Sequence, residues 1–347
     1  MASRPASNRH QRPNGQRDSK RMNHYLPIAI VAGFCTTLLN ISGYAGGIFG
    51  LGFLLVLAAP LPLMIASLGW GNFAGLIAAL TSGVTTALMI SPLAGLLFAL
   101  LTSLPAWWIC HLASLSRVDE HTGEVFFYPL SRLLMWIAGF AAVATLAMFV
   151  PFGFSLDTYM DAISTLVKQI YDGGQFADAG VDLDGLVQLV GRMAPTASAL
   201  MLVFSMATNL YIAGKVVHKS GRLARPWPGL HWLTLPPVGA YIFLAALIGL
   251  FVLPDLSGVL AQIVASCFGA VLLLVGLSVI HNMTVGNPFR GGVLWVTYIL
   301  LIILQWISFF VVILGTTEVL LDLRARRLSS RSNDGPDGQN DDQSEPD

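Results

Sequence analysis

No Asp, Glu, Lys or Arg occurs anywhere between Met22 and Ser116. A helix needs about 20 mostly apolar residues to cross a bilayer, so this uncharged run alone is long enough for several crossings. A water-soluble domain carries roughly 25% charged residues, which cover the outer faces of its helices. Here only 11% of the residues are charged and 55% are hydrophobic. The sequence therefore predicts a polytopic integral membrane protein.

Further uncharged runs repeat this pattern almost to the end of the chain, and together they predict an all-α transmembrane bundle of eight or nine helices. The nine candidate spans are about Leu26–Ile41, Ile48–Leu68, Asn72–Ile90, Leu93–Leu112, Leu133–Phe152, Met193–Val216, Pro237–Leu253, Val259–Ile280 and Val293–Leu320. Only short joins separate the first three, so a count of eight stays open.

Polar segments flank the predicted membrane domain, residues 24–323. The basic segment 1–23 and the Ser-, Asn- and Asp-rich segment 324–347 hold too few apolar residues to form a core. Both are therefore predicted to be disordered tails.

The distribution of Lys and Arg predicts the orientation, because these residues collect in cytoplasmic loops. A cytoplasmic N-terminus places most of the 19 Lys and Arg residues inside. If there are nine spans, the Lys and Arg residues that fall on the outer side include four that follow the last span, Arg324, Arg326, Arg327 and Arg331. An eight-helix count returns these four to the cytoplasmic side.

The longest polar stretch between spans is the acidic insertion 155–192. Its apolar residues recur at helical spacing in two groups, Met160, Ile163, Leu166, Val167 and Ile170, then Leu183, Leu186, Val187 and Val190. This spacing predicts two amphipathic helices on the outer membrane surface. A lid over a substrate entrance is the alternative.

Few polar side chains fall inside the spans, and each requires a reason because burial in a bilayer is costly. Asn209 is the most central, and it can bind a substrate or form an interhelical hydrogen bond. Pro60 and Pro62 must interrupt their helix. Broken helices line many transport sites, although a plain kink satisfied by neighbouring helices explains the prolines equally well.

His281 and Arg290 flank the predicted turn between the eighth and ninth spans. As a pair they can hold an anionic group at the cytoplasmic face, or they can contact lipid headgroups. Arg222, Arg225 and Trp227 form a basic and aromatic loop that suits contact with lipid phosphate at the interface. Glu318, near the end of the ninth span, is the one acid that approaches a helix interior.

Sequence motifs for catalysis are missing. The chain has no Walker A sequence, no HExxH, no GxSxG and no spaced cluster of histidines or cysteines. We therefore expect no enzymatic activity, no metal and no cofactor. The net charge of zero gives no reason to expect a nucleic-acid partner.

Several short motifs resemble the YybS-like predicted membrane proteins of bacteria, in their alphaproteobacterial form, a family of unknown function. They are Pro60-Leu61-Pro62, Leu104-Pro105-Ala106-Trp107-Trp108, Tyr128-Pro129 with Arg132-Leu133, Ser220-Gly221-Arg222-Leu223-Ala224-Arg225-Pro226-Trp227-Pro228, and Leu277-Ser278-Val279-Ile280-His281 with Arg290. The resemblance implies a multi-pass protein of the bacterial inner membrane. It also implies a loose similarity to the substrate-binding components of energy-coupling-factor transporters, which borrow an external ATPase; those have about six helices, fewer than this chain.

These observations favour a transporter-like protein that binds a small molecule between its helices. Pro60, Pro62, Asn209, His281 and Arg290 are the predicted binding residues. Membrane lipids, a small-molecule substrate and a membrane protein or ATPase are the expected partners. The alternative is a scaffold that helps to assemble an envelope complex without transporting anything.

Overall fold

The computed structural model describes residues 14–45, 51–172, 182–223, 225–227, 233–324 and 326. These residues are almost entirely helical, which confirms the predicted all-α class. They form two compact units, and each unit is described separately below. The first comprises Met1–Leu115 and Asn209–Arg225, and the second Ser116–Thr208 and Pro226–Asp347.

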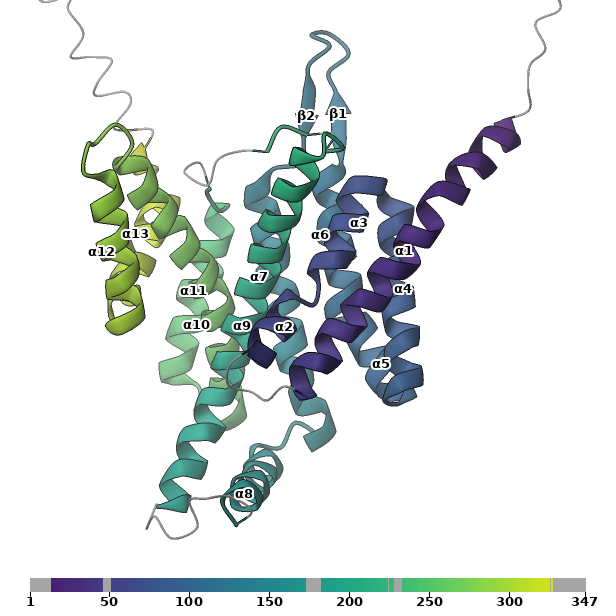
Figure 1. Cartoon of the computed structure of the whole chain (residues 1–347). Coiled ribbons are helices and arrows are strands. Elements are labelled where there is room, and N and C mark those ends of the chain that lie inside the picture. Colours follow the sequence, from purple (N-terminus) through teal and green to yellow (C-terminus); the bar gives the residue numbers. More distant parts are fainter. Residues whose placement is uncertain are drawn as a thin grey trace, which may run out of the picture. The chain divides into compact units, whose positions relative to one another are not determined.

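The first unit contains the helices that follow from the long uncharged run (Figure 1). They are α1 (Asn14–Ala45), α2 (Leu51–Ala58), α3 (Leu61–Trp70), α4 (Asn72–Met89), α5 (Pro92–Phe98), the π-helical turn η1 (Ala99–Ser103) and α6 (Leu104–Ser114). The Ser91 hydroxyl accepts the Ala94 N–H at 3.2 Å and so starts α5. Helix α3 begins directly after Pro60, which ends α2 because proline cannot continue its hydrogen-bond pattern.

Small residues let the helices of this unit approach closely, as is usual in membranes. The Cα of Gly33 in α1 lies against the backbone of α4, where a side chain would collide with the Ala78 carbonyl oxygen. Beside this contact the Thr37 hydroxyl donates to the Ser82 carbonyl at 2.9 Å, and the Ser82 hydroxyl donates to the Ser103 hydroxyl at 2.7 Å. The Thr37 and Ser82 hydroxyl groups therefore each find an acceptor inside the unit.

The second unit is arranged around one central helix, α11. Its elements are the hairpin β1 (Ser116–Val118) and β2 (Val125–Phe127), then α7 (Leu130–Leu146), the 3-10 turn η2 (Ala147–Phe152), α8 (Leu156–Asp172), most of α9 (Leu183–Lys219), α10 (Pro237–Val252), α11 (Asp255–Met283), α12 (Arg290–Ile303) and α13 (Ile307–Leu321). Helix α11 packs against α7, α10 and α13, and two thirds of its most apolar window is buried.

Seven of the described helical segments are long and apolar enough to cross a membrane. They correspond to the first six predicted spans and the eighth, except that residues 48–50 lie outside the described part of the chain and Ile90 follows the end of α4. Helix α10, the seventh predicted span, is shorter, and the non-helical residues Leu233–Pro236 precede it.

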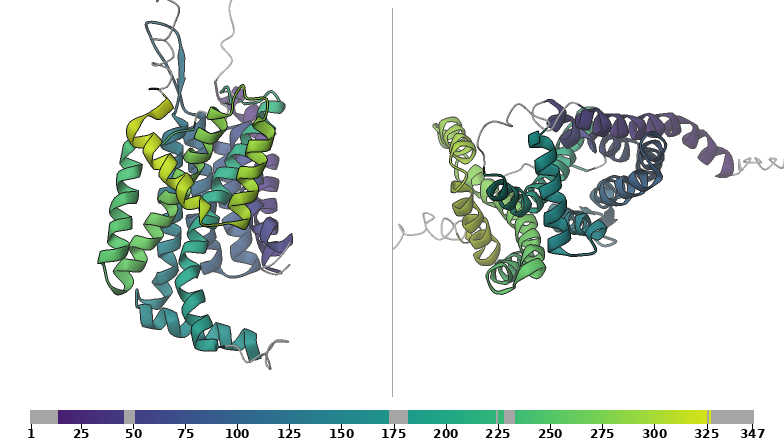
Figure 2. Two further views of the ribbon diagram at one scale, coloured as in Figure 1. Left: turned by 90° about the vertical axis from the view of Figure 1, so that its left-hand side faces the viewer. Right: turned by 90° about the horizontal axis from the view of Figure 1, so that it is seen from below.

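The ninth predicted span is wrong as a single helix. It divides into α12 and α13 at Leu304–Trp306, and the chain reverses there (Figures 1 and 2). The 14 residues of α12 and the 15 of α13 rise only about 21 and 22 Å at 1.5 Å per residue. A hydrocarbon core is about 30 Å thick. Because both helices are short, we expect them to form a re-entrant hairpin, which would enter and leave the membrane on the same side.

Such a hairpin favours the lower of the two predicted counts. Among the described residues, eight segments are then candidates to cross: the seven long apolar ones, α1, α2–α3, α4, α5–α6, α7, α9 and α11, and the shorter α10. An even number of crossings would return the chain after α13 to the side where α1 begins. With eight crossings, the sequence order would place all of the 19 Lys and Arg residues except Lys168 and Arg192 toward that side.

The acidic insertion contains one surface helix rather than two. Helix α8 lies across the direction of α9 and α11 at one end of the second unit (Figure 2). The Tyr159 hydroxyl donates to the Gly191 carbonyl at 3.1 Å and fixes α8 to α9. The second predicted amphipathic segment is the first part of α9, because its apolar spacing continues into the span without a break. Residues 173–181 lie outside the described part of the chain.

The described helices also extend beyond the predicted membrane domain. Residues 14–23, expected to belong to a disordered tail, form the start of α1. At the other end Arg324 is held by the fold, as described below. Residues 1–13, 325 and 327–347, the remainder of the two predicted tails, lie outside the described residues.

Candidate functional site

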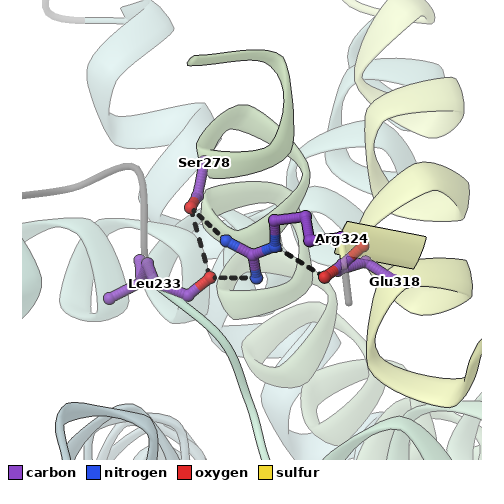
Figure 3. Close-up of polar contacts among 4 residues, drawn as sticks. All are labelled: Leu233, Ser278, Glu318 and Arg324. Carbon is purple, nitrogen blue, oxygen red and sulfur yellow. Dashed lines mark hydrogen bonds and ion pairs between the residues drawn. The ribbon is translucent and has the colours of Figure 1, made fainter. Parts of the chain in front are cut away.

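A buried ion pair joins Glu318 near the end of α13 to Arg324 just beyond it (Figure 3). The Arg324 Nε donates to Glu318 Oε1 at 2.6 Å. The guanidinium also donates to the Leu233 carbonyl at 2.9 Å and to the Ser278 hydroxyl at 3.3 Å, and the Ser278 hydroxyl donates to the same carbonyl at 3.2 Å. We call these four residues the Glu318 cluster.

The local sequence explains why Arg324 turns back to Glu318. The Asp322 N–H donates to the Glu318 carbonyl at 2.9 Å. Asp322 itself adopts the left-handed conformation, with φ 51° and ψ 53°, which ends a helix in a tight turn. The chain therefore reverses direction within the few residues that separate the two charges.

Two glycines bring α13 close enough to α11 for Ser278 to join the cluster. Gly315 of α13 lies against the Leu272 carbonyl, and Gly276 of α11 lies against the Val311 carbonyl. A Cβ atom at either position would collide with backbone, so these helices touch main chain to main chain. Ser278 follows Gly276 by two residues and faces the end of α13.

One oxygen of the Glu318 carboxylate has no hydrogen-bond partner within the described part of the chain. The side chain is only 1% exposed, and Oε2 is buried and unpaired. An unsatisfied buried acceptor raises the free energy of the fold by about 1–3 kcal/mol, more if charged. An ionisable side chain inside a membrane protein often marks a functional site for this reason.

The predicted residue Asn209 lies in the first unit, at the proline break. Its side-chain amide donates to the Leu57 carbonyl at 2.6 Å, just before the interruption at Pro60. Pro60 is buried and Pro62 is half-buried. Asn209 therefore stabilises the broken helix, and this contact supports the interhelical alternative for its role.

We expect Asn209→Ala to destabilise the protein by about 1 kcal/mol, the usual contribution of an interhelical hydrogen bond in a membrane. The apparent melting temperature of detergent-purified protein measures this loss. Thr208→Ala is the matched control, because Thr208 is exposed on the same helix. Equal melting temperatures for the two variants would show that the contact with Leu57 contributes nothing.

His281 and Arg290 lie in the second unit, at the two ends of the turn between α11 and α12. The His281 Nδ1 is 2.9 Å from the Leu277 carbonyl, and its Nε2 is 3.4 Å from the Tyr298 hydroxyl. His281 follows Ser278 by three residues, so the two share one face of α11. The predicted binding residues are thus divided between the units, with Pro60, Pro62 and Asn209 in the first.

The predicted lipid-contact loop has one exposed and one buried arginine. Arg222 is exposed and stacks its guanidinium 4.5 Å from the centre of the Trp70 ring. Arg225 is only 8% exposed and donates to the Ala113 carbonyl at 3.1 Å, and burial lowers the pKa of its guanidinium. Arg225 therefore contacts protein, and lipid contact remains a prediction for Arg222 and for the half-buried Trp227.

A family comparison covers most of both units and three of the four residues of the Glu318 cluster, since Arg324 lies beyond it. The model of a predicted membrane protein family, DUF2232, matches residues 35–318. The chain belongs to this family. The match is consistent with the resemblance to the YybS-like predicted membrane proteins, whereas the alphaproteobacterial form and the likeness to energy-coupling-factor components stay predictions. The matched residues include the helix break, Asn209, the α11–α12 turn and Glu318. Searches of curated proteins and of solved structures found no match.

Sequence reasoning identified Glu318 as a polar residue near a helix end but did not identify the other members of the cluster. Arg324 was assigned to the tail, and Ser278 was only part of a family motif. The sequence did contain a signal for the ion pair. A single acid in a long apolar segment is followed closely by an arginine, and a buried charge requires an opposite charge.

Proposed function

We propose that this family member is a component of a membrane transport system and binds a small polar solute at the Glu318 cluster. The observation that carries the proposal is the unpaired Oε2 of a carboxylate that is 1% exposed. A solute with an N–H or O–H donor would supply the missing hydrogen bond. His281, on the same face of α11 as Ser278, is placed to contact the solute from the adjoining turn.

The arrangement of helices supports the same proposal. Re-entrant and interrupted helices are recurrent in transporters, where they bring polar groups into the membrane. The described part of this chain has both, the α12–α13 hairpin and the break between α2 and α3. The π-helical turn η1 is a third irregularity, and such turns occur frequently at functional sites.

The proposed setting is the bacterial inner membrane with a cytoplasmic N-terminus, as the distribution of Lys and Arg favours. The Glu318 cluster then lies at the cytoplasmic end of the second unit. In an arrangement similar to energy-coupling-factor transporters, an external ATPase would act from that same side. Scaffolding without transport remains the alternative function.

A thermal-shift screen of small polar metabolites on detergent-purified protein tests the proposal. A solute at about a hundredfold excess over its Kd stabilises the folded state by about 2.7 kcal/mol, so the melting temperature should rise. The rise should be lost in Glu318→Gln, whose side-chain amide replaces one carboxylate oxygen with a donor. Asn209→Ala is the control, since it should lower the melting temperature yet keep the ligand response.

Two results would contradict the proposal. A solute that stabilises wild type and Glu318→Gln equally would place the site elsewhere. Absence of any stabilising solute, together with stoichiometric co-purification of an envelope protein, would favour the scaffold.

A further inference from the structure

The three groups that Figure 3 joins to the Arg324 guanidinium are all hydrogen-bond acceptors. The Arg324 Nε donates to the Glu318 carboxylate, Nη2 to the Leu233 carbonyl and Nη1 to the Ser278 hydroxyl. The Ser278 hydroxyl gives its own proton to the Leu233 carbonyl, so it meets the guanidinium with a lone pair. Each nitrogen of the guanidinium therefore has an acceptor, and the site suits a planar cation with several N–H groups.

The acceptors are held more firmly than the arginine that they bind. Glu318 and Ser278 lie on α13 and α11, which touch main chain to main chain at Gly315 and Gly276. Arg324 lies beyond the end of α13. Its side chain is 10% exposed, against 1% for Glu318. Arg324 can therefore leave the site without separating the two helices, and the acceptors stay in place.

The Glu318 carboxylate offers one acceptor that Arg324 does not use. Oε1 accepts the Arg324 Nε, whereas Oε2 is buried without a partner among the described residues. A cation that donates parallel N–H groups to both oxygens forms a bidentate pair, which is stronger and more specific than a single contact. A cation that is free to choose its orientation therefore has a hydrogen bond to gain over Arg324.

The charge of the site selects its ligand. Without Arg324 the cluster has one negative charge, that of Glu318, and a buried charge without an opposite charge is strongly destabilising. An anion would add a second negative charge. A neutral solute would leave the carboxylate uncompensated. The site therefore favours a cation with N–H groups.

We propose that the solute of the Glu318 cluster is a guanidinium or ammonium compound, and that Arg324 is an internal substitute that occupies the site until the solute displaces it. This inference rests on the proposed function and adds the chemical class of the solute and a means of control. Displacement of Arg324 releases the segment after α13 from Leu233 and Ser278, so binding of the solute changes the contacts between the segments that precede α10 and follow α13.

Chemical rescue of Arg324→Ala tests the inference, with ethylguanidinium chloride as the probe. Ethylguanidinium contains the side-chain atoms that this substitution removes. It should raise the melting temperature of detergent-purified Arg324→Ala toward that of wild type. Tetramethylammonium chloride, a cation without N–H groups, should not. Arg132→Ala is the matched control and should respond to neither salt, because Arg132 is exposed at the start of α7 in the same unit.

Arg324→Lys covers the case in which Arg324→Ala does not fold. Lysine keeps a positive charge beside Glu318, but its compact ammonium group lacks the planar fork of arginine and cannot reach all three acceptors. Lysine therefore competes for the site more weakly than arginine does. Ethylguanidinium should raise the melting temperature of Arg324→Lys more than that of wild type.

The inference is overturned if neither Arg324 variant responds to ethylguanidinium, or if both respond equally to tetramethylammonium. The same rescue in Arg324→Ala/Glu318→Gln would also overturn it, because the carboxylate would then play no part. The rescue needs no natural solute, so its failure is distinct from failure of the proposed function. A neutral or anionic solute that stabilises wild type but not Glu318→Gln would support the proposed function and overturn this inference alone.

Discussion

Replacing Arg324 with methionine is expected to lower the free energy of unfolding by about 3–5 kcal/mol, because it leaves the buried Glu318 carboxylate without its counter-charge. Arg324 also donates to the Leu233 carbonyl and the Ser278 hydroxyl, so the substitution releases the segment after α13 from the segment before α10 and from α11. The apparent melting temperature and the yield of folded protein from detergent measure this loss.

The double variant Glu318→Leu/Arg324→Met separates the charge effect from simple loss of packing. Apolar replacements for a whole buried ion pair are often neutral or stabilising. We therefore expect the double variant to recover most of the stability that Arg324→Met loses. If the double variant is no more stable than Arg324→Met, the unpaired Glu318 charge is not the cause of the stability lost in Arg324→Met.

Gly315→Ala is expected to destabilise the protein by about 3 kcal/mol, at the upper end for overpacking a well-filled core. The new Cβ would collide with the Leu272 carbonyl, and backbone cannot move aside as a flexible side chain can. Helix α13 would have to separate from α11, which would also displace Glu318. Melting temperature in detergent is again the measurement.

Gly139→Ala is the matched control for Gly315→Ala. Gly139 lies within α7, and a Cβ there would meet no atom within 4 Å. Alanine at an open helical position is about 0.5–1 kcal/mol more favourable than glycine, so this variant should be slightly more stable than wild type. A similar loss in both variants would contradict the close contact between α11 and α13.

Most of the crossing helices could be predicted because charge is excluded from lipid, and charge is easy to read in a sequence. The re-entrant hairpin could not be predicted in this way. Residues 304–306 contain no proline or glycine, and the uncharged run continues through them. Hydrophobicity indicates that a segment is in the membrane, but it does not indicate where the chain turns back. The four arginines after Val293–Leu320 were the only sequence observation against a ninth crossing.

The candidate site was predictable only in part, because its contacts join residues far apart in the chain. Asn209 was identified as a polar residue in a span, yet its partner Leu57 lies 152 residues away. Ser278 and Arg324 are 46 residues apart. Such pairings depend on which helices pack together. The glycines that decide the packing of α11 and α13 resemble the other glycines of a membrane protein.

The side of the membrane that each end occupies tests the eight crossings and the re-entrant hairpin most directly. Short epitope tags would be placed before residue 14, between residues 173 and 181, and after residue 326, one in each of three proteins. Protease or antibody access would then be compared in intact and permeabilised cells. The fold predicts that the first and third tags share one side and that the second is on the other. A third tag on the side of the second would mean nine crossings and would contradict the hairpin.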